Sequence, residues 1–172
     1  MKRLINFLFA VILSVSLYTN ASAQMSIGGG VVYGFDIEDI GIQASGTYNL
    51  SPEMRLGGDI IYWLIGDETF FGETWSTTFV EVNANFNYIF YDENDLSIYG
   101  LGTLGIHYAS FSFDYSFNGF DESGSESDTE LGLGLGVGFE YNLGGVVLYS
   151  EPRIFLSGFD QFALSAGLRI PF

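Results

Sequence analysis

The chain has 172 residues, of which 48% are hydrophobic and only 15% are charged, and its 21 acidic and five basic residues give a formal net charge of −16. This length corresponds to a single domain, and the absence of cysteine excludes disulfides, thiol nucleophiles, cysteine zinc sites and a lipidated cysteine. The scarcity of lysine and arginine excludes nucleic-acid binding, which needs clustered basic residues. With 23 glycines and 17% aromatic residues, the composition indicates β-sheet rather than helix.

The first 23 residues have the features of a secretory signal peptide. Lys2 and Arg3 give a positive start, residues 4–17 are almost entirely apolar, and Ala21-Ser22-Ala23 offers the small residues that a signal peptidase requires. The apolar run is shorter than the roughly 20 residues of a membrane-spanning helix. We therefore predict export and cleavage after Ala23, which removes two basic residues and leaves a mature domain of residues 24–172 with a net charge of −18.

The mature chain alternates between apolar residues and small or polar ones, which is the period of a β-strand. The alternation is clearest in four segments, which are residues 40–49, 80–90, 131–143 and 162–172. It is looser over residues 25–35 and 54–64, and weakest over residues 96–108 and 146–156. These segments predict about eight strands, each close to the length of about 9 to 11 residues that a tilted strand needs to cross a bilayer.

The predicted connections alternate strictly in length. Short turns are expected at residues 49–53, 92–95 and 142–145, and long loops at residues 65–75 and 110–129, with shorter members of the long class at residues 36–39 and 157–161. In an up-and-down barrel all long connections then fall at the same end. The fold class that we predict is therefore all-β, a transmembrane antiparallel up-and-down β-barrel.

A soluble β-sandwich or lipocalin is the alternative, and the polar face of the strands argues against it. A soluble barrel needs a charged outer surface. The polar positions here are mostly glycine, serine, asparagine and threonine, and no lysine follows Lys2. The apolar positions end in aromatic residues, as expected where strands meet the membrane interface.

From Met25 to Phe172 this pattern resembles the small outer-membrane β-barrel superfamily, of the OmpA/OmpX and porin-family type. The most specific resemblance is the closing strand, which looks like the signal read by the barrel assembly machinery; its residues are Phe162, Leu164, Leu168, Ile170 and Phe172. The resemblance implies a monomer in the outer membrane of a Gram-negative envelope. It also implies outer-membrane lipid and lipopolysaccharide as surroundings, and the assembly machinery as a partner during insertion.

If the apolar residues face lipid, the charged residues of the strands point into the barrel. The candidates for luminal ion pairs are Arg55, Asp59, Glu81, Glu140, Glu151, Arg153 and Arg169. Buried charges are costly unless paired, so we expect the three arginines to pair with some of the four carboxylates. Because the interior of an eight-stranded barrel is just wide enough to be filled by side chains, a general diffusion pore is not expected. A narrow channel for small solutes is the second hypothesis.

A lipid A-modifying enzyme is the third hypothesis, and the sequence gives it little support. His107 is the only histidine, and Ser110, three residues on, falls on the opposite face of a strand. The glycines between residues 132 and 138 open no helix, so they do not form a phosphate-binding loop; they are expected to leave room for large neighbours. We therefore predict no enzymatic function and no cofactor or metal site.

Two acidic segments, within residues 67–73 and 121–130, are expected to be solvated extracellular loops. Binding of calcium, or of the cations that bridge lipopolysaccharide, is the alternative. Before the second segment an alternating aromatic series forms a candidate surface-binding edge, made of Phe111, Phe113, Tyr115 and Phe117. This alternation offers an alternative to a loop, in which the strand continues above the membrane as a protruding ribbon. Packing of these rings on a hairpin around Phe70, Phe71 and Trp75 is the simpler interpretation. The leading hypothesis is a structural or surface-binding barrel whose extracellular ligand the sequence does not identify.

Overall fold

A computed structural model describes residues 24–66, 68–70, 73–117, 120–157 and 159–172, so the predicted signal peptide lies outside the described residues. The described residues form nine strands: β1 (Met25–Gly34), β2 (Asp39–Asn49), β3 (Met54–Trp63), β4 (Glu68–Phe70), β5 (Glu73–Glu93), β6 (Leu96–Phe117), β7 (Phe120–Asn142), β8 (Val147–Ser157) and β9 (Gln161–Pro171). This part of the chain contains no helix that is long and apolar enough to cross a membrane.

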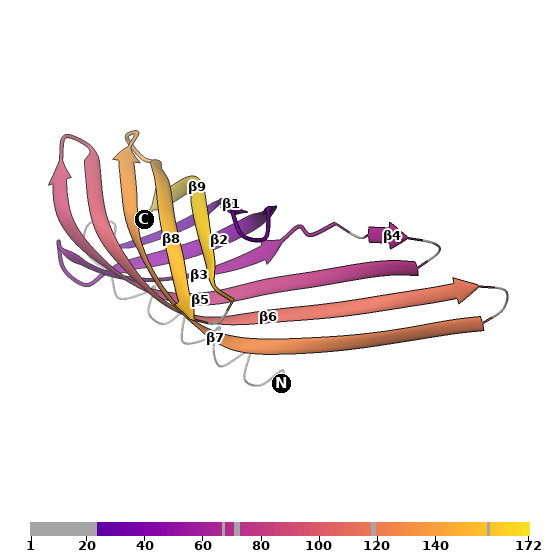
Figure 1. Ribbon diagram of the computed structural model, residues 1–172. Coiled ribbons are helices and arrows are strands. Elements are labelled where there is room, and N and C mark those ends of the chain that lie inside the picture. Colours follow the sequence, from indigo (N-terminus) through magenta and orange to yellow (C-terminus); the bar gives the residue numbers. More distant parts are fainter. Residues whose placement is uncertain (1–23, 67, 71–72, 118–119, 158) are drawn as a thin grey trace, which may run out of the picture.

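Eight strands close into a ring of antiparallel neighbours (Figure 1). The hydrogen-bonded order is β3-β2-β1-β9-β8-β7-β6-β5, and β3 pairs with β5 to complete the ring. The three-residue strand β4 pairs with the beginning of β5 and stands outside the ring. The predicted up-and-down barrel of eight strands is therefore confirmed.

Tight turns at residues 50–53, 94–95 and 143–146 lie at one end of the barrel, which we call the turn end. Asn94 and Asp95 have φ values of 51° and 67°, which fit the two-residue hairpin turn that requires positive φ at both positions. Gly144 and Gly145 also have positive φ, at 83° and 129°. The opposite end, where the longer connections lie, is called the ribbon end.

The outer wall of the ring is apolar. Val31 and Leu135, for example, are each 57% exposed, whereas the residues on the other face of the strands are mostly buried. Exposed aromatic side chains form two belts, with Tyr33, Tyr62 and Tyr108 near the ribbon end and Tyr88, Tyr141 and Phe172 near the turn end. An apolar surface of this extent is abnormal in water and normal in a bilayer, with the belts at its two interfaces.

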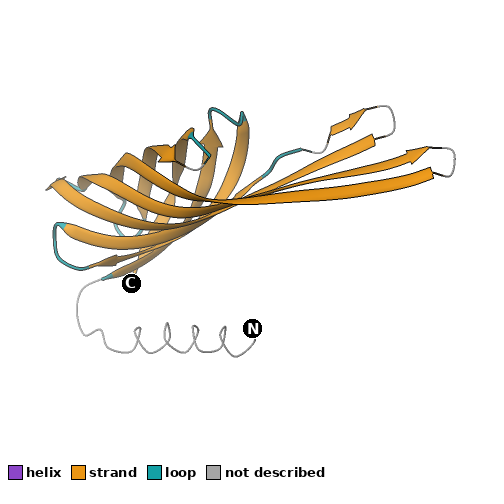
Figure 2. Cartoon of the chain, turned by 60° about the horizontal axis from the view of Figure 1, so that its bottom comes forward, coloured by secondary structure: helices purple, strands orange, loops and turns teal. Residues whose placement is uncertain are grey.

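The prediction of long loops at residues 65–75 and 110–129 is wrong, because most of these residues belong to strands. β5, β6 and β7 are 21, 22 and 23 residues long and continue well beyond the ring (Figures 1 and 2). β5 pairs with β3 only from Val80 to Tyr88, and β7 pairs with β8 only from Leu133. Residues 73–78, 110–117 and 120–130, together with β4, make up the protruding ribbon.

The protruding ribbon extends beyond the apolar wall of the ring. At about 3.3 Å per residue, β7 is far longer than the apolar band of about 25 Å that an outer-membrane barrel presents to lipid. Along the outward face of β6 the residues change from Ile106 and Tyr108 to Ser110 and Ser112. This change from apolar to hydroxyl side chains marks the end of the apolar wall.

Candidate functional site: the barrel interior and the protruding ribbon

Glycines on the inner face of β7 make room for large side chains. A methyl group added to Gly132 would collide with the ring of His107, and one added to Gly138 would collide with the ring of Tyr99. A methyl group added to Gly134 would lie 3.0 Å from the ring of Phe155, and one added to Gly136 would first meet the backbone oxygen of Pro152, at 2.5 Å. The prediction that these glycines accommodate large neighbours is therefore confirmed at Gly132, Gly134 and Gly138, each of which faces an aromatic ring.

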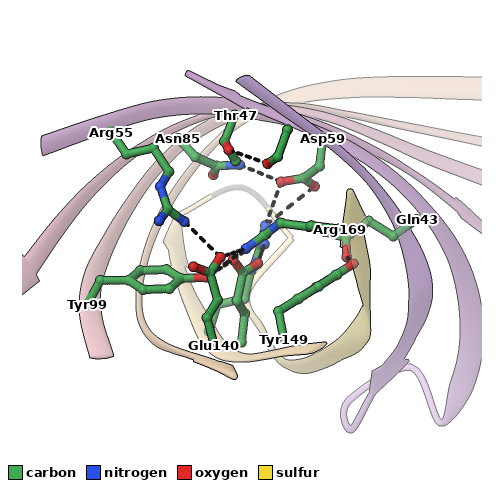
Figure 3. Close-up of polar contacts among 12 residues, drawn as sticks. Gln43, Thr47, Arg55, Asp59, Asn85, Tyr99, Glu140, Tyr149 and Arg169 are labelled. Atoms are coloured by element: carbon green, nitrogen blue, oxygen red, sulfur yellow. Dashed lines mark hydrogen bonds and ion pairs between the residues drawn. The ribbon is translucent and has the colours of Figure 1, made fainter. Parts of the chain in front are cut away.

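Six charged side chains meet in the interior and form one network (Figure 3). Arg55 contacts Glu140 at 2.7 Å, and Arg169 contacts both Glu140 and Glu151, the latter at 2.7 Å. Arg153 joins Glu151 at 2.8 Å to Asp59 at 3.2 Å. The three arginines balance the three carboxylates, so the network is formally neutral. All six side chains are buried, which strengthens their mutual attraction but makes each of them costly to leave unpaired.

Aromatic hydroxyl groups complete this network. Tyr99 donates a hydrogen bond to Glu151 at 2.5 Å and accepts one from Arg169 at 3.0 Å. The guanidinium of Arg169 also lies 4.0 Å from the centre of the Tyr149 ring, and Tyr149 donates to Gln43 at 2.8 Å across the barrel. These contacts connect β2, β6, β8 and β9 through the interior.

Glu81, the seventh candidate, lies apart from the arginines. Its carboxylate accepts hydrogen bonds from Trp63 at 2.8 Å, Gln161 at 2.6 Å and Asn83 at 3.3 Å, and it lies 3.9 Å from Nε2 of His107. Asn83 also donates to Asp59 at 3.0 Å. A chain of polar contacts therefore runs from Arg55 near the turn end to Glu81.

Between Glu81 and the ribbon end, the interior of the barrel is mostly apolar. The buried members of this apolar stopper are Val32, Ile61, Trp63, Phe79, Ala109 and Ala163. Ile37, Ile65 and Phe159, one from each of three connections at the ribbon end, pack against it. The rings are in mutual contact, with centroid distances of 6.0 Å from Phe79 to Trp63 and 5.3 Å from Phe79 to Phe159.

A cavity of about 520 Å³ opens at the turn end of the barrel. Its lining includes Arg55, Glu140 and Arg169, together with acidic residues of the turn between β5 and β6. Glu151 and Arg153 are not part of its lining, so the cavity does not reach the centre of the network.

The protruding ribbon has two chemically different faces. Because directly paired residues point to the same side of a sheet, the register groups Phe111 with Thr77 and Glu126, and Phe113 with Trp75 and Gly124. Asp128, paired with Ala109, lies on the same side. We call this the aromatic face, made of Trp75, Thr77, Phe111, Phe113, Glu126 and Asp128. The other face carries hydroxyl groups, at Ser76, Thr78, Ser110, Ser112, Ser125 and Ser127.

The predicted surface-binding edge is partly packed and partly exposed. The rings of Phe113 and Trp75 lie 5.6 Å apart, so the simpler interpretation applies to this pair. Phe111 is 54% exposed and Trp75 is 48% exposed. The side chains of Tyr115, Phe117 and Phe70, and all of Phe71, lie outside the part that the structure describes.

Other sequence candidates are placed as follows. The five residues of the expected assembly signal, Phe162, Leu164, Leu168, Ile170 and Phe172, are all exposed on the outer wall, and their recognition by the assembly machinery stays a prediction. His107 is fully buried inside the barrel and contacts Phe155 edge-on at 4.6 Å. Within the described ranges, no group of three or more histidine and acidic side chains is arranged to hold a metal ion.

Comparison with protein families decides the assignment. The family described as "Outer membrane protein beta-barrel domain" matches residues 7–168. The chain belongs to this family. It is therefore an integral outer-membrane β-barrel protein, and no curated protein sequence matches it significantly.

Solved structures show the same fold for this outer-membrane barrel. Neisserial surface protein A has a TM-score of 0.59 at 17% identity, covering 89% of this chain and 100% of that one. Ail, the attachment invasion locus protein of Yersinia pestis, has a TM-score of 0.56 at 23% identity, covering 85% and 96%, and has also been solved in complex with the heparin analogue sucrose octasulfate. A major outer membrane protein from Thermus thermophilus has a TM-score of 0.64 at 14% identity, covering 88% and 100%. These likenesses agree with the fold class predicted from the sequence.

Sequence reasoning missed the stopper and the partners of Glu81. Phe79 and Ala109 fall on the inward parity of β5 and β6, so strict alternation could have placed them inside. Ile37, Ile65 and Phe159 come from connections, where no periodicity indicates direction. Their meeting depends on the closed ring.

Proposed function

We propose that this outer-membrane barrel is a surface-binding protein rather than a pore. Its filled interior supports the second half of this proposal. A solute entering at the turn end meets the ion-paired network of Arg55, Glu140 and Arg169, and beyond that the apolar stopper. Among the described residues, these two barriers of opposite chemistry lie in series along the interior, which supports a filled barrel and agrees with the small diameter of eight-stranded barrels.

The observation that carries the proposal is the protruding ribbon. In outer-membrane barrels the short turns face the periplasm and the longer connections face outward, so the ribbon would extend into the medium. A ribbon of three long strands and β4 gives the protein an ordered surface above the membrane, with one edge of β5 covered by β4. Ail, which is similar in fold, has been crystallised with a ligand, and this supports a binding role for such barrels.

The channel alternative is tested by conductance. Purified protein in a planar bilayer is expected to show no large and stable open state. A sustained conductance that survives repeated reconstitution would contradict the filled interior.

The binding role is tested by shortening the ribbon. Ser110 and Ser127 are direct partners on β6 and β7, so residues 111–126 can be replaced by Asn-Gly, which favours a two-residue hairpin turn. The shortened protein is expected to insert and to show the heat-modifiable mobility of a folded barrel, while cells that display it lose attachment to surfaces or host proteins. Unchanged attachment with the shortened barrel would contradict the surface-binding role.

A further inference from the structure

We propose that the aromatic face of the protruding ribbon binds an extended, basic segment of a partner protein. This inference rests on the proposed surface-binding function and names the chemistry of its partner. It is carried by the exposed rings of this face, by the carboxylates beside them and by the spacing of those carboxylates.

The exposed rings have no membrane to cover them. On the barrel wall, exposed apolar side chains are in lipid, but Phe111 and Trp75 lie above the boundary at which the outward face of β6 changes to serine. In water, clustered exposed aromatic side chains mark a surface that contacts another molecule. The aromatic face therefore needs a partner, and its charge indicates which kind.

Carboxylates stand beside these rings. Glu126 is the direct β7 partner of Phe111, and Asp128 is the next residue along the same face; both are exposed. An ammonium or guanidinium group placed over the ring of Phe111 would contact the ring face and the Glu126 carboxylate together. No lysine or arginine side chain among the described residues competes for this position, because the three arginines there are buried in the barrel.

The spacing favours an extended partner. Glu126 and Asp128 are two residues apart on one strand, which separates them by about 6 to 7 Å. Alternate side chains of an extended peptide repeat at the same distance. The matching sequence therefore carries lysine or arginine at every second position.

Two other occupants are disfavoured by charge. A second copy of this chain would place carboxylates opposite carboxylates, which is repulsive. A polysulfated ligand of the kind bound by Ail has the wrong sign for a face that carries Glu126 and Asp128.

The test uses the full-length processed barrel in zwitterionic nanodiscs and a fluorescent peptide of alternating arginine and serine. Binding is expected, and it should weaken as the salt concentration rises from about 0.05 M to about 0.5 M, because the contacts are exposed. Changing Glu126→Gln and Asp128→Asn together is expected to weaken binding about tenfold. The matched control is Glu53→Gln with Glu93→Gln at the turn end, which removes the same charge and should leave binding unchanged.

Aromatic variants separate ring chemistry from apolar area. Phe111→Ala and Phe111→Leu should both weaken binding, because leucine keeps an apolar side chain but has no ring face for the cation. A peptide of alternating glutamate and serine serves as the control ligand. The inference would be overturned if the Glu126/Asp128 variant bound the basic peptide as tightly as the unchanged protein does, or if the unchanged protein bound the control peptide as tightly as the basic one. A preference for sucrose octasulfate over the basic peptide would also overturn it. If the shortened ribbon abolishes cell attachment while the basic peptide fails to bind, the surface-binding function stands and the proposed partner chemistry falls.

Discussion

The ring of Tyr99 lies over Gly138, its direct partner on the neighbouring strand. Any side chain at position 138 would occupy the space of the ring. Because the Tyr99 hydroxyl also bonds Glu151 and Arg169, displacement of the ring would disturb the charged network. Glycine at position 138 is therefore a condition for the contacts that Tyr99 makes inside the barrel.

Gly138→Ala is accordingly expected to lower the free energy of unfolding by about 1 to 3 kcal/mol, the usual cost of an overpacked interior. Urea unfolding in lipid vesicles, followed by tryptophan fluorescence, measures this change. Gly100→Ala is the matched control, since an added methyl group there would meet no atom within 4 Å. Equal stability of the two variants would show that the ring has room to move.

The charged network predicts a larger effect for one carboxylate. Glu140 contacts both Arg55 and Arg169, so Glu140→Gln leaves two buried guanidinium groups with an uncharged partner. We expect a loss of about 3 to 5 kcal/mol in the free energy of unfolding. The same change at Glu93, which is exposed near the turn end, should have little effect in the same urea titration. A Glu140→Gln variant as stable as the Glu93→Gln variant would mean that the ion pairs do not stabilise the barrel.

In the apolar stopper, the rings of Phe79 and Phe159 meet edge-on, with their centroids 5.3 Å apart. A double-mutant cycle with Phe79→Ala and Phe159→Ala is expected to give a coupling energy of about 0.5 to 1.5 kcal/mol. Phe79→Ala alone should cost about 3 to 5 kcal/mol, because Phe79 is buried among other rings. Additive effects of the two changes would place Phe159 outside the stopper.

The sequence predicts the strands of the ring well where one face carries only apolar residues and the other carries mostly small ones. Residues 131–143 are predicted as a strand for this reason, and all but the last of them lie in β7. In β6 the alternation is weak because Tyr99 and Leu101 are apolar and yet face inward. The ribbon part of β7 has polar residues on both faces, since both are solvated, and such a strand cannot be told from a loop by periodicity.

The partners inside the barrel depend on register between strands that are distant in the sequence. Alternation places Arg169 and Glu151 on the inner face, but it does not predict the position of each residue along the barrel axis. These positions follow from the closure of the ring, which pairs Glu151 with Ser165 and Arg169 with Val147. The identity of the charged residues was therefore predictable, and their pairing was not.

An arginine introduced at two different positions tests whether the outer wall of the barrel faces lipid and the ribbon faces water. Leu135 is 57% exposed on the outer wall, within the paired region of β7, and Leu135→Arg should destabilise the barrel by about 2 to 4 kcal/mol if this position is near the bilayer midplane. Ser125→Arg, on the hydroxyl face of the ribbon, should change stability by less than about 0.5 kcal/mol, because a surface position in water tolerates charge. Folding of both variants into vesicles, measured by heat-modifiable mobility over a urea series, compares them directly. If Ser125→Arg proved as destabilising as Leu135→Arg, the ribbon would have to lie in lipid, and the boundary at Tyr108 would be misplaced.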